Sequence, residues 1–175
     1  MTQAQGNERI RGYILSQANK LTIPELVGKV RKDVAHLRDV AATIPSPRFA
    51  ERPAPREWSA AEVFTHILDM NERGAAAIVG ILDHGQMPAA QRDDVTGETR
   101  PGLHDADDYW RTFQAVREPL LDRVLSARGD EHLEVKITHS WFGDFTWREW
   151  LLFMRVHDLD HMRQLQSISA HFAGR

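Results

Sequence analysis

The chain of 175 residues contains no cysteine, which excludes disulfide bonds and thiolate metal sites. This fits a reducing compartment, and any thiol chemistry would need a thiol supplied from outside the chain. An excess of charge of one sign is missing too, because 22 Lys and Arg stand against 25 Asp and Glu, a formal net charge of −3. That near balance gives no general case for nucleic acid or an anionic membrane as a partner.

Long hydrophobic segments are also missing. No fully apolar run is longer than the one from Trp150 to Met154, which is far too short to span a bilayer. The N-terminal residues MTQAQGNERIRG lack the basic-then-apolar pattern of a secretory signal. We therefore expect a soluble, cytoplasmic protein without nucleic acid or membrane as a partner.

Three helix starts share the capping-box pattern, a hydroxyl residue followed three positions later by glutamate. The hydroxyl accepts a free backbone N–H of the first turn, and the carboxylate accepts the N–H of the hydroxyl residue. The pairs are Thr22/Glu25, Ser59/Glu62 and Thr146/Glu149.

Apolar residues at helical spacing predict four long helices, over residues 23–43, 60–83, 105–127 and 147–170. Pro119 lies inside the third and predicts a kink. The connections are predicted as an extended proline-rich stretch over 44–56, a long loop over 84–103, and an irregular segment over 132–145 with room for a short hairpin.

Four amphipathic helices of this length predict an all-α fold, a four-helix bundle built around one core. We expect the bundle domain to span residues 21–175. Residues 1–20 are then an N-terminal extension, either a loose segment or a short helix.

The run HDLDH places His157 and His161 four residues apart in the last predicted helix. On a helix that spacing puts both imidazoles on one face, where they can bind the same metal ion. Nine histidines make such a pair common by chance, so the spacing alone is weak evidence. Position adds to it, because His161 falls within the apolar stripe, His157 lies at its edge, and Asp158 also points inward.

A third histidine, His66, lies at the flank of the apolar stripe of the second predicted helix. If that helix neighbours the last one, three imidazoles could meet in a cleft and leave metal positions open, a catalytic rather than structural pattern. His139 is the reserve ligand because it closely precedes the last helix. The alternative for each histidine is a core residue whose ring nitrogens are satisfied by neighbours.

Three polar residues of the last helix have more than one predicted role. Asp158 or Asp160 could orient a ligand or act as a base, and either could instead be ion-paired or face solvent. Gln164, one turn beyond His161, could donate to a substrate or to a backbone carbonyl.

The sequence resembles the DinB-like (DinB/YfiT) superfamily in two places. WSAAE at 58–62, followed by His66, resembles the family's second helix. HSWFGDFT at 139–146, followed by HDLDH at 157–161 and Gln164, resembles its last connection and last helix. The resemblance covers roughly residues 21–171, and it implies an up-down-down-up four-helix bundle that is often a homodimer.

The resemblance also implies one divalent metal held by three histidines, at the positions of His66, His157 and His161. Imidazole ligands suit Zn, Ni, Fe or Co. Several family members are thiol-dependent S-transferases or isomerases, some are hydrolase-like, and many have no assigned activity. The family has no short thiol-binding signature, so the resemblance does not identify the substrate of this chain.

The leading hypothesis is a metal-dependent S-transferase or hydrolase acting on a small molecule, with an external low-molecular-weight thiol as the cosubstrate of the transferase. The alternative is a non-catalytic metal-binding stress or interaction protein with the same bundle. A ferritin-type di-iron site would need Glu-x-x-His on two helices, whereas this chain offers only Asp33-x-x-His36 and Asp158-x-x-His161. A zincin would need glutamate, not aspartate, after the first histidine.

Overall fold

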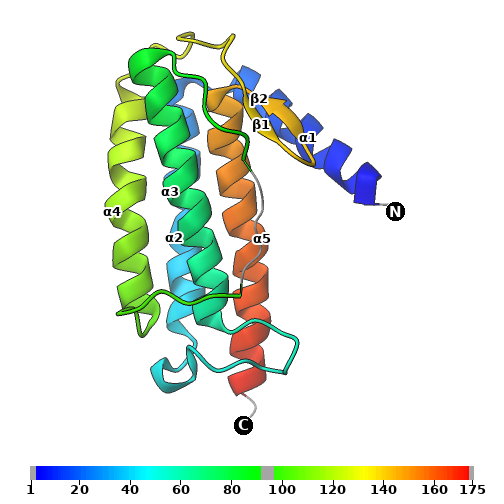
Figure 1. Cartoon of the computed structure of the whole chain (residues 1–175), viewed down its shortest axis with the longest axis vertical. Coiled ribbons are helices and arrows are strands. Elements are labelled where there is room, and N and C mark those ends of the chain that lie inside the picture. Colours follow the sequence, from blue (N-terminus) through cyan, green and yellow to red (C-terminus); the bar gives the residue numbers. More distant parts are fainter. Residues whose placement is uncertain (1–2, 92–96, 174–175) are drawn as a thin grey trace.

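The computed structural model describes residues 3–91 and 97–173. This part of the chain is mostly helical, with five α-helices, a short 3-10 helix and two short strands (Figure 1). In chain order they are α1 (Gln3–Lys20), α2 (Ile23–Ala42), η1 (Ser46–Arg48), α3 (Ala60–His84), α4 (Ala106–Leu125), β1 (Ile137–His139), β2 (Gly143–Phe145) and α5 (Trp147–Ala173). The helical content agrees with the all-α prediction.

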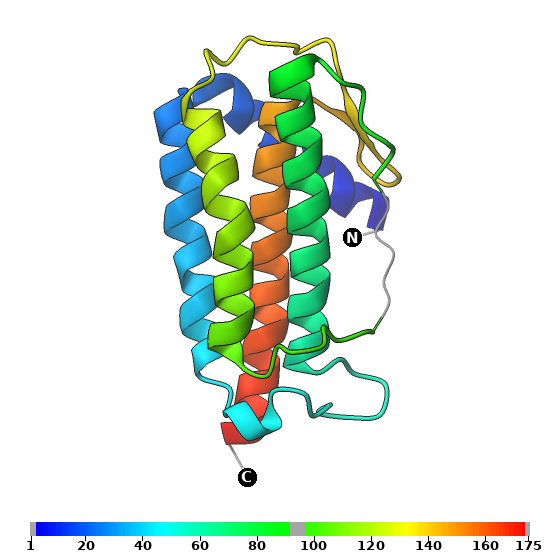
Figure 2. The ribbon, with the colours of Figure 1, turned by 60° about the vertical axis from the view of Figure 1, so that its left-hand side comes forward.

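Helices α2 to α5 run alongside one another (Figures 1 and 2). α2 and α5 run in one direction along the long axis, and α3 and α4 run in the other. α2 and α3 each pack against both α4 and α5, whereas α1 lies outside this group and packs against α5. None of the described helices is both long and apolar enough to cross a membrane.

All three predicted capping boxes form, and they explain where α2, α3 and α5 begin. In each box the glutamate carboxylate accepts the backbone N–H of the hydroxyl residue, at 2.8 Å for Thr22, 2.8 Å for Ser59 and 2.7 Å for Thr146. The reciprocal bonds to the hydroxyl oxygens are present as well. α4 starts with another cap, because the Asp105 side chain accepts two backbone N–H groups of the first turn.

The differences from the predicted elements lie at helix ends and in the connections. α3 and α5 extend to His84 and Ala173, and α4 continues through Pro119 to Leu125. The stretch over 44–56 contains the single turn η1 where an extended connection was predicted, because the proline after Ser46 suits a first helical turn. In the predicted loop over 84–103, residues 92–96 lie outside the described residues.

The short hairpin before α5 is present. β1 and β2 pair antiparallel, with His139 opposite Gly143, and Gly143 takes a φ of 74° that favours glycine. On the other side, Gln91 forms an isolated bridge with His139. The hairpin therefore lies directly before the helix that carries the HDLDH run.

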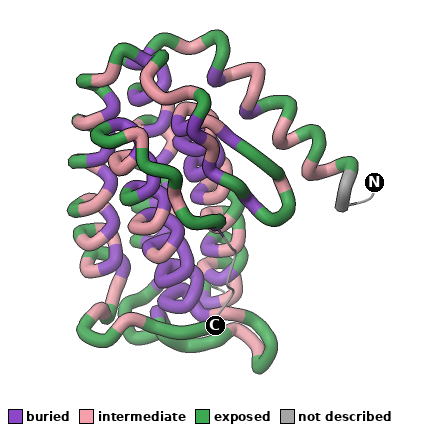
Figure 3. The backbone as a smooth tube through the Cα atoms, turned by 45° about the horizontal axis from the view of Figure 1, so that its top comes forward, coloured by how far each residue is buried: buried purple, intermediate pink, exposed green. Residues whose placement is uncertain are grey.

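Buried residues line the inward sides of α2 to α5 and continue into the hairpin (Figure 3). The first turns of α5 are especially rich in them, and Trp147 and Trp150 are fully buried. Farther along α5, burial falls on one side, and His157 and His161 are only half-buried. The core thus fixes the start of α5, and its later turns carry polar side chains toward α3.

Candidate metal centre

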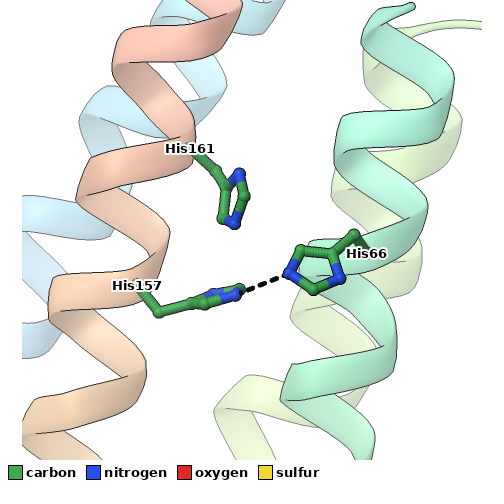
Figure 4. Close-up of side chains that lie close together, drawn as sticks. All are labelled: His66, His157 and His161. Atoms are coloured by element: carbon green, nitrogen blue, oxygen red, sulfur yellow. Dashed lines mark hydrogen bonds between the residues drawn. The ribbon is translucent and has the colours of Figure 1, made fainter. Parts of the chain in front are cut away.

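Three histidines from two helices point toward one another where α3 and α5 pack together (Figure 4). Nε2 of His157 lies 2.9 Å from Nε2 of His66. One ring nitrogen from each of His66, His157 and His161 lies within 4.8 Å of the other two. Because His66 and His157 are 91 residues apart in the sequence, the group exists only in the folded chain.

The protonation of His161 already suits metal binding. Its Nδ1 lies 3.1 Å from Oε1 of Gln164. An amide oxygen can only accept, so Nδ1 of His161 donates its proton and Nε2 keeps a free lone pair. Burial lowers the pKa of His161 below its usual value, and the neighbouring His157 lowers it further. Both effects favour the neutral imidazole, the form that binds a metal ion.

The three side chains fit a divalent transition metal. A tetrahedral ion with nitrogen ligands at about 2.0–2.1 Å separates those nitrogens by about 3.3 Å. The His66–His157 separation of 2.9 Å is slightly shorter, and the others are at most 4.8 Å. Small side-chain rotations would therefore bring all three to the required spacing. A set of neutral imidazoles suits Zn, Ni, Fe or Co and leaves the ion its full charge.

The three histidines line a pocket of about 1050 Å³. Aromatic side chains from two connections form part of its wall, namely Trp58 before α3 and Trp141 and Phe142 in the hairpin. The Trp58 ring meets His66 edge-on, with centroids 5.7 Å apart. An ion held by the three imidazoles would therefore have a side open to a small molecule.

A buried ion pair lies directly behind His157. Arg117 of α4 donates from Nη2 to Oδ2 of Asp158 at 2.8 Å, and both side chains are at most 2% exposed. Nε of Arg117 donates to Oδ1 of Asn71 on α3 at 2.7 Å. The inward orientation predicted for Asp158 is confirmed, and its partner is a positive charge from another helix.

Arg117 and Asn71 were missed by the sequence reasoning, although one signal was present. Arg117 follows Phe113 by four residues and precedes Leu120 by three, so it falls on the apolar stripe of α4. Its guanidinium also lies over the Phe113 ring, 4.7 Å from the centroid. A charge on an apolar stripe predicts a buried partner of opposite sign.

A family model described as the DinB superfamily matches residues 29–165. This chain belongs to the DinB superfamily. The matched region contains all three histidines of the cluster and confirms the family resemblance. One relative, the uncharacterized protein YuaE of Bacillus subtilis (strain 168), is 26% identical over 135 residues, which cover 69% of this chain and 83% of the relative.

In this DinB protein the reserve ligand His139 lies apart from the three histidines. It is 1% exposed, and its ring packs against those of Phe142, Trp150 and Phe153. Its Nδ1 accepts the backbone N–H of Trp141 at 3.1 Å. It does not belong to the group that could hold a metal among the described residues. His139 is therefore a core residue that closes the hairpin.

The other polar candidates are more exposed. Asp160 is exposed and lies 3.5 Å from the guanidinium of Arg163, the ion-paired alternative stated for it. His36, His84 and His104 are exposed as well, and none is in the cluster. Asp158 and Gln164, in contrast, lie next to ring nitrogens of His157 and His161.

Proposed function

We propose that this DinB protein is a metal-dependent enzyme acting on a small molecule, first as a thiol-dependent S-transferase and second as a hydrolase. His66, His157 and His161 are the proposed ligands of one divalent ion. The observation that carries the proposal is the convergence of three ring nitrogens within 4.8 Å on the wall of a pocket of about 1050 Å³. Three imidazoles with an open side are typical of catalytic rather than structural sites.

A bound ion would supply positive charge that lowers the pKa of a thiol or a water molecule at the open side of the site. The chain contributes the neutral imidazoles, and Gln164 holds the ring of His161. The aromatic wall at Trp58 and Phe142 offers apolar contact to a substrate and keeps part of the site from bulk water. Since the chain has no cysteine, the thiol comes from the cosubstrate.

The non-catalytic alternative requires a site closed by a side chain of the protein. All three histidines line the pocket, which supports the enzyme over a purely metal-storing protein. Hydrolase and transferase share the same ligands and differ in whether water or a thiol reaches the open side.

We also propose that α2 to α5 form the up-down-down-up bundle of the family. The directions of the helices, with α3 and α4 opposite to α2 and α5, support it, and so does their packing, in which α2 and α3 each contact α4 and α5. The division of the chain at residue 20, the homodimer and the cytoplasmic location stay predictions. Sedimentation equilibrium of the full chain tests the dimer.

Metal analysis of protein purified without a polyhistidine tag tests the site. We expect about one divalent ion per chain, and its loss in the His157→Ala variant. His36→Ala is the matched control, because it removes an exposed histidine outside the cluster. A wild-type chain that retains no ion after exposure to Zn, Ni, Fe and Co in turn would reject the site.

Titration of the cobalt-loaded protein with low-molecular-weight thiols tests the chemistry. Thiolate binding to cobalt adds charge-transfer absorption in the near ultraviolet, and we expect at least one thiol to produce it. A spectrum that no thiol changes rejects the S-transferase. Hydrolysis assays with ester and amide substrates then decide between the hydrolase and the non-catalytic protein.

A further inference from the structure

We propose that Asp158 is a positioning residue for His157: when a metal binds, Oδ1 of Asp158 accepts a hydrogen bond from the Nδ1–H of His157, and Arg117 holds the carboxylate in place. The proposal rests on the proposed three-histidine site. It adds a contribution from α4, a helix that supplies no ligand.

The first observation is a pair of buried atoms that face each other. Nδ1 of His157 lies 3.8 Å from Oδ1 of Asp158, beyond hydrogen-bonding distance. Both atoms are buried without a hydrogen-bond partner among the described residues. Buried polar atoms without partners are costly, so a small rotation of the His157 ring that joins these two would be favourable.

The second observation is the contact between His157 and His66. Their Nε2 atoms are 2.9 Å apart, so one of the two donates a proton to the other. A metal ion needs the lone pair of each Nε2 and therefore excludes that proton. A neutral His157 bound through Nε2 carries its single proton on Nδ1, opposite Oδ1 of Asp158. If His157 was the donor, its proton moves from Nε2 to Nδ1 with no net gain or loss.

The two ligands on α5 differ in this respect. His161 already donates its Nδ1 proton to Gln164. Nδ1 of His157 lies 3.8 Å from its proposed acceptor, Oδ1 of Asp158. The hydrogen bond between them forms when the ion replaces the contact between His157 and His66. Metal-bound histidines usually donate their second ring N–H to a carboxylate or carbonyl, which fixes the ring and raises the basicity of the ligand atom.

Arg117 completes the arrangement from behind. It engages Oδ2 of Asp158 and leaves Oδ1 available toward His157. Its own position is fixed by Asn71 and by the Phe113 ring. The guanidinium thus supplies the opposite charge that a buried carboxylate requires and sets the direction of the free oxygen.

Zinc titrations of matched variants test the proposal. Asp158→Ala alone leaves Arg117 buried without its counter-charge, so the double variant Asp158→Ala/Arg117→Gln, which is neutral at both positions and has no acceptor at position 158, is the main test. We expect its zinc affinity to fall about 10- to 100-fold, the usual range for such partners of a ligand. Asp160→Ala is the matched control, an exposed aspartate of the same run, and should leave the affinity unchanged.

Nitrogen-15 NMR of the histidine rings gives a readout that a merely structural ion pair would not move. In the zinc-loaded wild type we expect a His157 proton on Nδ1, shifted downfield by a carboxylate acceptor, with the signal assigned through correlations between the ring and the backbone of His157. In the double variant that downfield shift should disappear, while circular dichroism shows an intact fold.

Two results overturn the proposal. One is a folded double variant that binds zinc as tightly as the wild type. The other is a zinc-loaded wild type whose His157 proton shows no carboxylate acceptor. A wild type that binds no zinc, nickel, iron or cobalt rejects the three-histidine site and the positioning role together, which separates the two failures.

Discussion

His139 and His157 both pack against the ring of Phe153, and they use their nitrogens in opposite ways. His139 turns Nδ1 back to its own hairpin, where it accepts the backbone N–H of Trp141. His157 turns Nε2 across the helix contact to His66. Burial beside an aromatic ring is common to both, so what separates a core histidine from a candidate ligand is where the ring nitrogens point.

The surroundings of the two residues differ as well. His139 lies among aromatic rings and has almost no exposed surface. His157 lines the pocket on one side and has the buried carboxylate of Asp158 on the other. The first environment holds a hairpin together, and the second would offer an ion both a ligand and an approach through the pocket.

The largest expected effect comes from removing a ligand. His157→Ala or His161→Ala should abolish stoichiometric metal binding, because each breaks the pair of imidazoles that α5 holds on one face. His66→Ala keeps that pair and should weaken binding roughly 10²- to 10³-fold, a loss of about a third of a binding free energy of 10 kcal/mol or more. Isothermal titration with zinc measures this. If His66→Ala keeps tight, stoichiometric metal, the three-histidine site is wrong and His139 becomes the candidate ligand.

A smaller loss is expected from Gln164→Ala, which removes the acceptor of the His161 Nδ1 proton. The affinity for zinc should fall about 10-fold, the low end of the range for partners of a ligand. Gln164→Glu keeps an accepting oxygen and should restore most of the affinity. Equal affinities for Gln164→Ala and the wild type would show that the ring of His161 needs no such support.

His139→Ala should separate stability from metal binding. The loss of a buried ring and its hydrogen bond should lower the free energy of unfolding by about 1–3 kcal/mol, as measured by urea denaturation. The zinc affinity of the folded variant should stay within about 2-fold of the wild type, since His139 supplies no atom to the group that could hold the ion. A large loss of zinc binding would place His139 in the metal site after all.

The smallest structural effect is expected from removing the metal itself. The buried core is large enough to keep the helices folded without an ion, so chelation should leave the far-ultraviolet circular dichroism unchanged. Unfolding of the helices on chelation would mean that the ion is structural, as in a zinc finger.

The sequence alone predicted the parts of the fold that depend on local interactions. The boxes at Thr22, Ser59 and Thr146 mark helix starts because both partners lie within one turn. The helix ends and the turn at η1 were less predictable, since no comparable local pair fixes them. The histidine pair on α5 was visible for the same local reason, its spacing of four residues.

The contacts between distant segments could not be derived in this way. That His66 meets His157 depends on which helices neighbour each other. The position of His66 on its helix made the contact conditional on that neighbourhood, and the family resemblance then implied it. The bond from Arg117 to Asp158 spans 41 positions and joins α4 to α5. Only an unusual charge on the apolar stripe of α4 marked it beforehand.

The separation of 91 positions between His66 and His157 has a consequence for a chain without cysteine. An ion bound by both histidines would be a reversible cross-link between α3 and α5. It would bind the folded chain and not the unfolded one, because only folding brings the two histidines together. At a free metal concentration 100 times the dissociation constant, this linkage adds about 2.7 kcal/mol to the free energy of unfolding. The free metal concentration in the cell would then set the free energy of unfolding of the chain.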